Sequence, residues 1–147
     1  MAWEVDAPVR PLDGPLAALT VSHCHCARCR KAASAAYFSA LVTALDGVRF
    51  TRGEARLVTY KVPEARFFEH RFCATCGSSM PRRSAERGIT IVPMGSLDDD
   101  PGAHPGAHMF VASKAPWDVI TDDLPQHDEY PRREPRPRSP RAVASGQ

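Results

Sequence analysis

The chain has 147 residues, a length typical of one domain with its own core. No apolar run approaches the ~18 residues of a membrane span, and no signal segment opens the sequence, which predicts a cytoplasmic protein without a membrane partner. The formal net charge of +2 resides in residues 126–147, so the rest of the chain is neutral. We therefore expect no nucleic-acid interface on the core, because such an interface needs a basic face.

Short strand candidates, separated by turn residues, follow one another along the chain. Apolar or alternating runs predict strands at residues 3–5, 18–22, 37–42, 48–51, 56–62, 66–72, 88–92 and 108–113. Asp46-Gly47 is a hairpin signal, helix is limited to a short turn within residues 30–36, and Trp117 is expected in the core. This regular spacing predicts a small all-β domain.

The last part of the chain differs from the rest in composition. Residues 126–147 are rich in proline and arginine, and proline at that density prevents helices and central strands. The sequence therefore predicts a domain at 1–125 and a disordered, basic tail at 126–147.

Three of the five cysteines, Cys24, Cys26 and Cys29, fall within six residues. Alternate side chains of an extended segment share a face, and a Cys-x2-Cys turn brings a third sulfur back toward the first two. Closed structural zinc sites usually have four protein ligands, whereas three ligands leave a position for substrate or water. His23 and His25 fall on the opposite face by parity and are weaker candidates for a fourth ligand. The spacing predicts an open zinc site.

A second cysteine feature is Cys73-x2-Cys76, followed by Gly77. This pattern is typical of a zinc knuckle, in which backbone N–H groups turn toward the sulfurs and the glycine relieves the tight bend. We therefore expect Cys73 and Cys76 to be metal ligands as well.

The same residues allow a second interpretation. Cys26-x2-Cys29 and Cys73-x2-Cys76 could pair as the two knuckles of a zinc ribbon, with Cys24 left over. The protein would then be a non-catalytic binding or scaffold module with a closed four-cysteine site. Spacing alone leaves this alternative open.

Taken together, five landmarks between about residues 3 and 124 resemble the CENP-V/GFA domain family, named for the glutathione-dependent formaldehyde-activating enzyme. The landmarks are Cys24-His25-Cys26-Ala27-Arg28-Cys29-Arg30-Lys31, Phe72-Cys73-Ala74-Thr75-Cys76-Gly77-Ser78, Gly95-Ser96-Leu97-Asp98-Asp99, His108, and Ser113-Lys114-Ala115-Pro116-Trp117. The resemblance implies a β-tent of antiparallel sheets organised around zinc, with the catalytic zinc on Cys24, Cys26 and Cys29. It also implies a carbon–sulfur lyase whose substrate is the adduct of a small thiol, such as glutathione, with a small aldehyde such as formaldehyde.

The resemblance further implies a structural zinc site, in which Cys73 and Cys76 join a Cys-x-Cys of the first strand. This chain has Trp3 in its first strand candidate and no cysteine before Cys24. Either the natural chain starts upstream of this sequence and carries the missing pair, or the protein has lost half of its structural site, and two thiolates alone make a poor zinc site.

Several other polar residues are candidates for the site. Arg71, Arg82 and Arg83 could hold the carboxylates of a glutathione-like ligand or could be surface charge. His108 is a candidate for a role near the zinc or for a structural hydrogen bond. Residues 98–100, three consecutive aspartates beside Pro-Gly, favour a solvated loop over a metal site.

Overall fold

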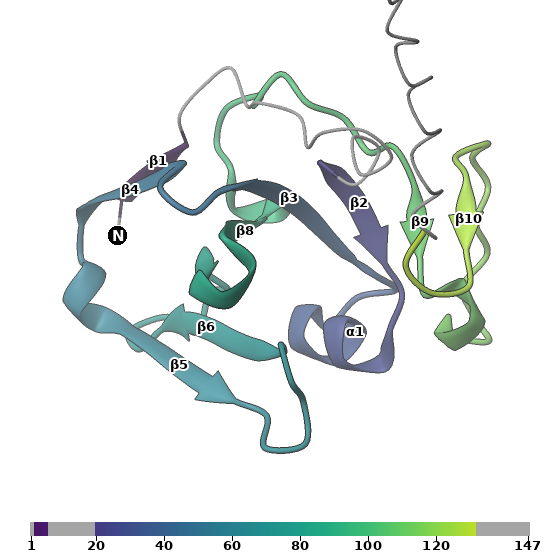
Figure 1. Cartoon of the computed structure of the whole chain (residues 1–147), viewed down its shortest axis with the longest axis horizontal. Helices are drawn as coiled ribbons and strands as arrows, with labels where there is room; N and C mark the ends of the chain where they lie inside the picture. The colour runs from purple at the N-terminus through teal and green to yellow at the C-terminus, as the bar shows by residue number, and fades with distance from the viewer. Residues whose placement is uncertain (1, 6–19, 132–147) are drawn as a thin grey trace, which may run out of the picture.

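The computed structural model describes residues 2–5 and 20–131, which form three antiparallel or mixed sheets and one α-helix (Figure 1). One sheet has six strands in the order β10-β9-β2-β3-β8-β7, and two further sheets are the ribbons β1-β4 and β5-β6. The elements are β1 (Ala2–Val5), β2 (Val21–Cys24), α1 (Ala27–Ala33), β3 (Phe38–Ala44), β4 (Val48–Arg52), β5 (Leu57–Lys61), β6 (Glu69–Cys73), β7 (Arg82–Ser84), β8 (Ile89–Pro93), β9 (His108–Met109) and β10 (Gln126–His127).

The centre of the six-stranded sheet is β3, which pairs antiparallel with both β2 and β8. Its residues Ala40, Leu41 and Thr43 are buried, so both faces of the strand are covered. The main core cluster consists of Val21, Leu41, Val48 and Val92, with Trp3, Phe50, Met94 and Leu97 packed against it. Burying each large apolar side chain contributes roughly 1.5–3 kcal/mol, so this cluster fixes β2 against β3.

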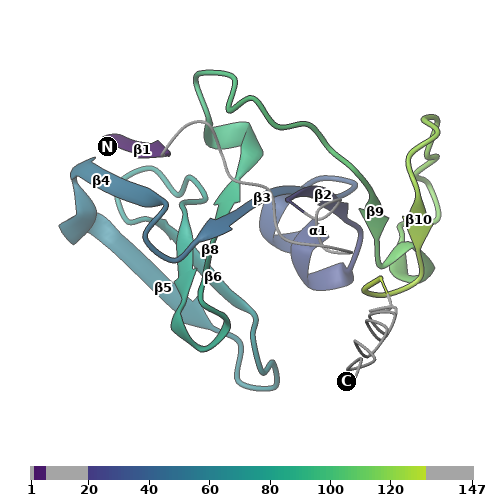
Figure 2. The ribbon, with the colours of Figure 1, turned by 45° about the horizontal axis from the view of Figure 1, so that its top comes forward.

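The two ribbons flank the sheet, and α1 lies between the β5-β6 ribbon and the β9-β10 side of the molecule (Figures 1 and 2). β1 pairs antiparallel with β4, with Trp3 opposite Phe50. β5 pairs antiparallel with β6, which ends at Cys73. The β1-β4 ribbon thus places Trp3 beside β4, and the β5-β6 ribbon leads into the turn that begins at Cys73.

The all-β prediction is confirmed, because strands dominate the described residues and α1 is a single short helix. The strand predicted at 108–113 is wrong beyond Met109, since Phe110 adopts a left-handed conformation (φ 58°) and Val111–Ser113 form a 3-10 turn. β10 lies beyond the predicted domain boundary at residue 125, so described structure continues to residue 131, and residues 132–147 lie outside the described part.

The predicted core position of Trp117 is also wrong, because its side chain is 69% exposed. The buried residue of this segment is Ala115. A turn closed by the hydrogen bond from Asp118 N to Ala115 O (3.0 Å) directs the two side chains differently.

No helix in residues 2–5 or 20–131 is both long and apolar enough to cross a membrane.

Candidate metal centre

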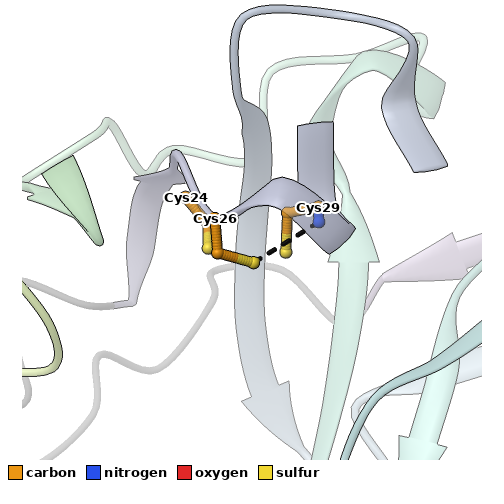
Figure 3. A group of neighbouring side chains, drawn as sticks. All are labelled: Cys24, Cys26 and Cys29. Carbon is orange, nitrogen blue, oxygen red and sulfur yellow. Dashed lines mark hydrogen bonds between the residues drawn. The ribbon is translucent and has the colours of Figure 1, made fainter. Parts of the chain in front are cut away.

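The sulfurs of Cys24, Cys26 and Cys29 lie within 4.8 Å of one another (Figure 3). Cys24 is the last residue of β2, Cys26 is the N-cap of α1, and Cys29 lies in the first turn of the helix. The Cys26 backbone is extended (φ −62°, ψ 149°), and its sulfur accepts a hydrogen bond from Cys29 N at 3.4 Å. A strand end followed directly by a helix start therefore brings together three thiols from six consecutive residues.

Arg30 fastens this loop to its surroundings. Its Nε donates to the carbonyl oxygen of His25 at 3.1 Å, and its Nη2 donates to the carbonyl oxygen of Ser113 at 3.3 Å. Arg30 thus connects α1 to His25, which lies between Cys24 and Cys26, and to the turn after β9. These contacts limit the movement of the loop that carries the three sulfurs.

The three thiols have very different proton affinities. The pKa of Cys26 is lowered because the Cys24 and Cys29 thiols, and backbone N–H groups of the loop, donate hydrogen bonds to its sulfur. The pKa of Cys24 is raised to about 11, chiefly by its hydrogen bond with Cys26, and the pKa of Cys29 is raised by its hydrogen bonds with Cys24 and Cys26. A thiol must lose its proton to become a thiolate ligand, so a metal ion that binds these sulfurs competes with protons for them.

Two residues of the triad, Cys24 and Cys29, line a cavity of about 450 Å³, whose wall also contains Arg82 and Arg87. The remaining lining is mainly apolar and includes Met109. Burial lowers the pKa of Arg82, whose Nη1 donates to the carbonyl oxygen of Glu69 at 2.9 Å. A cavity of this size with convergent thiols and cations has the character of a small-molecule site.

Two histidines form a buried network behind the triad. His25 Nε2 and His108 Nδ1 are 2.8 Å apart, and His108 Nε2 is 3.0 Å from Oδ1 of Asp122. His25 Nδ1 lies 3.3 Å from Oδ2 of Asp118, which is ion-pair distance without the geometry of a hydrogen bond. His108 therefore has the structural hydrogen-bonding role rather than a place among the sulfurs.

The parity argument for His23 and His25 agrees with the structure. His23 Nδ1 lies 2.9 Å from Ser39 Oγ, and His25 faces His108. Among the described residues, Cys24, Cys26 and Cys29 cluster as possible metal ligands, and no histidine belongs to this cluster.

The structure does not assemble the four-cysteine ribbon site. Cys73 and Cys76 line a different cavity, of about 890 Å³, which none of the three clustered cysteines lines. Cys73 Sγ accepts a hydrogen bond from Thr75 N at 3.3 Å, and Gly77 N donates to Cys73 O at 2.8 Å, so the predicted knuckle is formed. The backbone N–H groups of Thr75 and Cys76 lower the pKa of Cys73 to about 7.

Of the three predicted arginines, Arg82 lines the cavity of about 450 Å³ with Cys24 and Cys29, and Arg71 and Arg82 line a much smaller cavity, of about 20 Å³, with Cys29. Arg71 lies 3.8 Å from Glu54 and covers the Phe50 ring, while Arg83 donates to the carbonyl oxygen of Val48 at 3.0 Å. The aspartates at 98–100 are exposed, and Asp100 Oδ1 accepts a hydrogen bond from Gly102 N, as expected for a loop.

Sequence reasoning missed two residues of the cavity. Arg87 is the last residue of a 3-10 turn (Ala85–Arg87) between β7 and β8, and Tyr130 packs edge-on against Phe110 with ring centroids 4.9 Å apart. Tyr130 stands in the segment predicted to be a disordered tail. Neither residue has a motif of its own, and both reach the cysteines through contacts that are distant in sequence.

Two comparisons with known proteins find a match. A crystal structure of a Rhodobacter sphaeroides protein is 26% identical, covers 70% of this chain and 82% of its own, and has a TM-score of 0.47. No curated protein matches the chain significantly. The family model of the glutathione-dependent formaldehyde-activating enzyme, GFA, matches residues 12–113, which include all five cysteines. The chain therefore belongs to the GFA family.

Proposed function

We propose that this protein is a zinc-dependent enzyme that forms or cleaves the carbon–sulfur bond between a small thiol, of the glutathione type, and a small aldehyde such as formaldehyde. The observation that carries the proposal is that Cys24 and Cys29 share one cavity with Arg82 and Arg87. Sulfur ligands and anion-binding groups are thereby found on the walls of the same small-molecule site.

The donor set fits zinc. Three cysteine sulfurs within 4.8 Å of one another match the preference of this ion for thiolates, and no fourth ligand from the described residues joins them. Zinc held by these cysteines would supply a Lewis acid that keeps a substrate sulfur in its thiolate form near neutral pH.

The two arginines select the kind of thiol. Guanidinium groups bind carboxylates through paired, charge-assisted hydrogen bonds, and a partly apolar cavity strengthens these bonds by excluding water. Arg87 is exposed and extends over the Phe67 ring at 5.6 Å, so its charge is available to an incoming ligand. A thiol that carries carboxylates, as glutathione does, is the substrate class that this cavity favours.

The reaction conserves atoms and charge. In the forward direction the thiol sulfur bonds to the carbonyl carbon, and the carbonyl oxygen gains the proton that the thiol loses. In the reverse direction the carbon–sulfur bond breaks and the same proton returns. Arg82 and Arg87 act by holding the thiol so that its sulfur lies at the Cys24 and Cys29 wall.

We propose the cytoplasm as the location. All five cysteines are free thiols, which a reducing compartment maintains.

The test is to follow adduct formation between ¹³C-formaldehyde and glutathione by NMR, with zinc-loaded protein and with the Cys24→Ser variant. We expect the protein to accelerate the approach to equilibrium, and we expect the variant to lose the acceleration. Zinc-edge X-ray absorption on the same samples should show an added sulfur neighbour with glutathione. A rate equal to the uncatalysed rate, together with a zinc spectrum unchanged by thiols, would reject the proposal.

A further inference from the structure

The second cysteine pair does not fit the zinc site that the family resemblance implies. Among the described residues, the possible metal ligands that cluster in a group of at least three are Cys24, Cys26 and Cys29. No described cysteine, histidine or carboxylate therefore joins Cys73 and Cys76 in such a group. All cysteines and histidines of the chain lie within the described ranges. Two thiols fall short of the four ligands of a closed structural zinc site.

The first strand occupies the region in which further ligands would be expected. Trp3 of β1 lines the same cavity as Cys73 and Cys76, and its side chain packs against the core cluster. β1 thus contributes an indole to this cavity and no sulfur, so the disagreement lies in the fold and not only in the residue count.

We propose that Cys73 and Cys76 form a thiol–disulfide exchange site for low-molecular-weight disulfides. The pair is a Cys-x2-Cys on a tight turn that opens into a cavity of about 890 Å³, a volume within the range of small-molecule sites. The cavity is separate from the one beside the metal centre, because none of its lining residues belongs to the cysteine triad.

The surroundings of the two sulfurs give them different roles. Cys76 is exposed, and its thiol lies 3.3 Å from the hydroxyl oxygen of Ser78, so an incoming disulfide reaches it first. Cys73 is only 4% exposed, and its sulfur accepts the hydrogen bond from Thr75 N, which stabilises negative charge on it. Access assigns the first step to Cys76, the thiol that an incoming disulfide can reach, and the stabilised thiolate of Cys73 then attacks Cys76 as the resolving group.

The exchange balances in two steps. Cys76 sulfur attacks one sulfur of the small disulfide, forming a mixed disulfide and releasing one small thiol, which takes the Cys76 proton. Cys73 sulfur then attacks Cys76 sulfur, forming the Cys73–Cys76 bond and releasing the second small thiol with the Cys73 proton. The protein loses two electrons, and the small disulfide, which is the oxidant, gains them.

The cavity lining carries polar groups suited to a peptide-like disulfide. Ser78, Ser79 and Ser96 supply hydroxyl groups, Asp98 supplies a carboxylate that can pair with an amino group, and Trp3 supplies an aromatic surface. Hydroxyl groups both donate and accept hydrogen bonds, so they can pair with the amides and carboxylates of such a ligand.

The experiment titrates the zinc-loaded full chain with mixtures of reduced and oxidised glutathione. Intact-mass and peptide mass spectrometry identify the disulfide, and elemental analysis gives zinc per chain. We expect a reversible Cys73–Cys76 disulfide with retention of about one zinc per chain, held by the triad. Cys73→Ser should accumulate a mixed disulfide on Cys76, because the resolving thiol is missing. Cys76→Ser should form neither product, because Cys73 is buried.

Three results would overturn the proposal. One is a second zinc equivalent that protects Cys73 and Cys76 from alkylation until it is chelated. Another is a dimer that binds an additional half equivalent of zinc per chain, which would mean that Cys73 and Cys76 of two copies together hold one zinc ion. The third is wild-type protein in which both thiols stay reduced in oxidised glutathione. The wild-type measurements need no variant, so a misfolded variant does not affect them.

Discussion

His25 and His108, which are 83 residues apart in the sequence, share a hydrogen bond of 2.8 Å between Nε2 and Nδ1, and both side chains are fully or almost fully buried. We expect His108→Ala to lower the free energy of unfolding by about 1–3 kcal/mol, because the buried His25 Nε2 loses its partner. Chemical denaturation at pH 7.5 measures the change. The control is His104→Ala, at an exposed position, for which a change within about 0.5 kcal/mol is expected. Equal effects of the two substitutions would contradict the structural role of His108.

Burial lowers the pKa of His23 and of His25 below the ordinary value of 6.5. Because the unfolded chain then binds protons more readily than the folded protein, the stability that these histidines contribute is complete above pH 6.5 and is lost as the pH falls below it. Ring-proton NMR titration should give midpoints below 6.5 for both residues, and the urea midpoint should fall between pH 7.5 and pH 5.5. Midpoints above 6.5 would show that the folded protein favours the charged rings.

Cys24→Ser should reduce the bound zinc from about one per chain to a small fraction after dialysis, because a hydroxyl replaces one of three thiolate ligands. Elemental analysis of the dialysed protein measures the loss. Cys76→Ser is the matched control and should retain its zinc, since Cys76 lies outside the triad. Similar losses in both variants would mean that the two cysteine groups share the metal.

Arg87→Ala should raise KM for a carboxylate-bearing thiol roughly tenfold, which corresponds to the loss of one charge-assisted hydrogen bond, and should leave kcat nearly unchanged. Arg66→Ala is a close control, because both guanidinium groups cover the Phe67 ring while only Arg87 lines the cavity with the cysteines. Initial-rate kinetics with glutathione separate KM from kcat. An equal rise in KM for both variants would point to a general effect of surface charge.

Gly47→Ala should destabilise the protein by about 1–3 kcal/mol by disturbing the turn between β3 and β4. A Cβ at this position would clash with Thr43 Oγ1 and lie 2.9 Å from Thr43 Cγ2, and Thr43 is buried. Gly95→Ala is the control, because nothing lies within 4 Å of a Cβ there. Thermal unfolding of the two variants gives the comparison, and a neutral Gly47→Ala would show that Thr43 moves aside at little cost.

The sequence was informative where structure depends on neighbouring residues. The alternation of strands and turns predicts the all-β class, which is confirmed. Asp46-Gly47 forms a turn between β3 and β4, but the predicted hairpin is wrong, because β4 pairs with β1 whereas β3 pairs with β2 and β8. The core position predicted for Trp117 is wrong, because its apolar character does not reveal the turn from Ala115 to Asp118, in which Ala115 is buried and Trp117 is exposed. Local propensity gives no warning of such a change.

The same distinction applies to the site. Cys24, Cys26 and Cys29 lie on one strand end and the following helix start, so their spacing alone predicts their convergence. Arg87 approaches them only because β8 pairs with β3 and β3 pairs with β2. Such pairings join residues that are far apart in the sequence, and no spacing rule within one segment reveals them.

The parallel pairing of β2 with β9 places His23 opposite His108 and Cys24 opposite Met109. The strand that carries the first cysteine therefore completes its hydrogen bonds with a segment that the ribosome makes about 85 residues later, at 5–20 residues per second. Until then the three thiols emerge without His108 and Met109 beside them. The local turn can bring the three sulfurs together early, whereas the cavity wall that Met109 forms beside Cys24 is completed only after this later segment has been made.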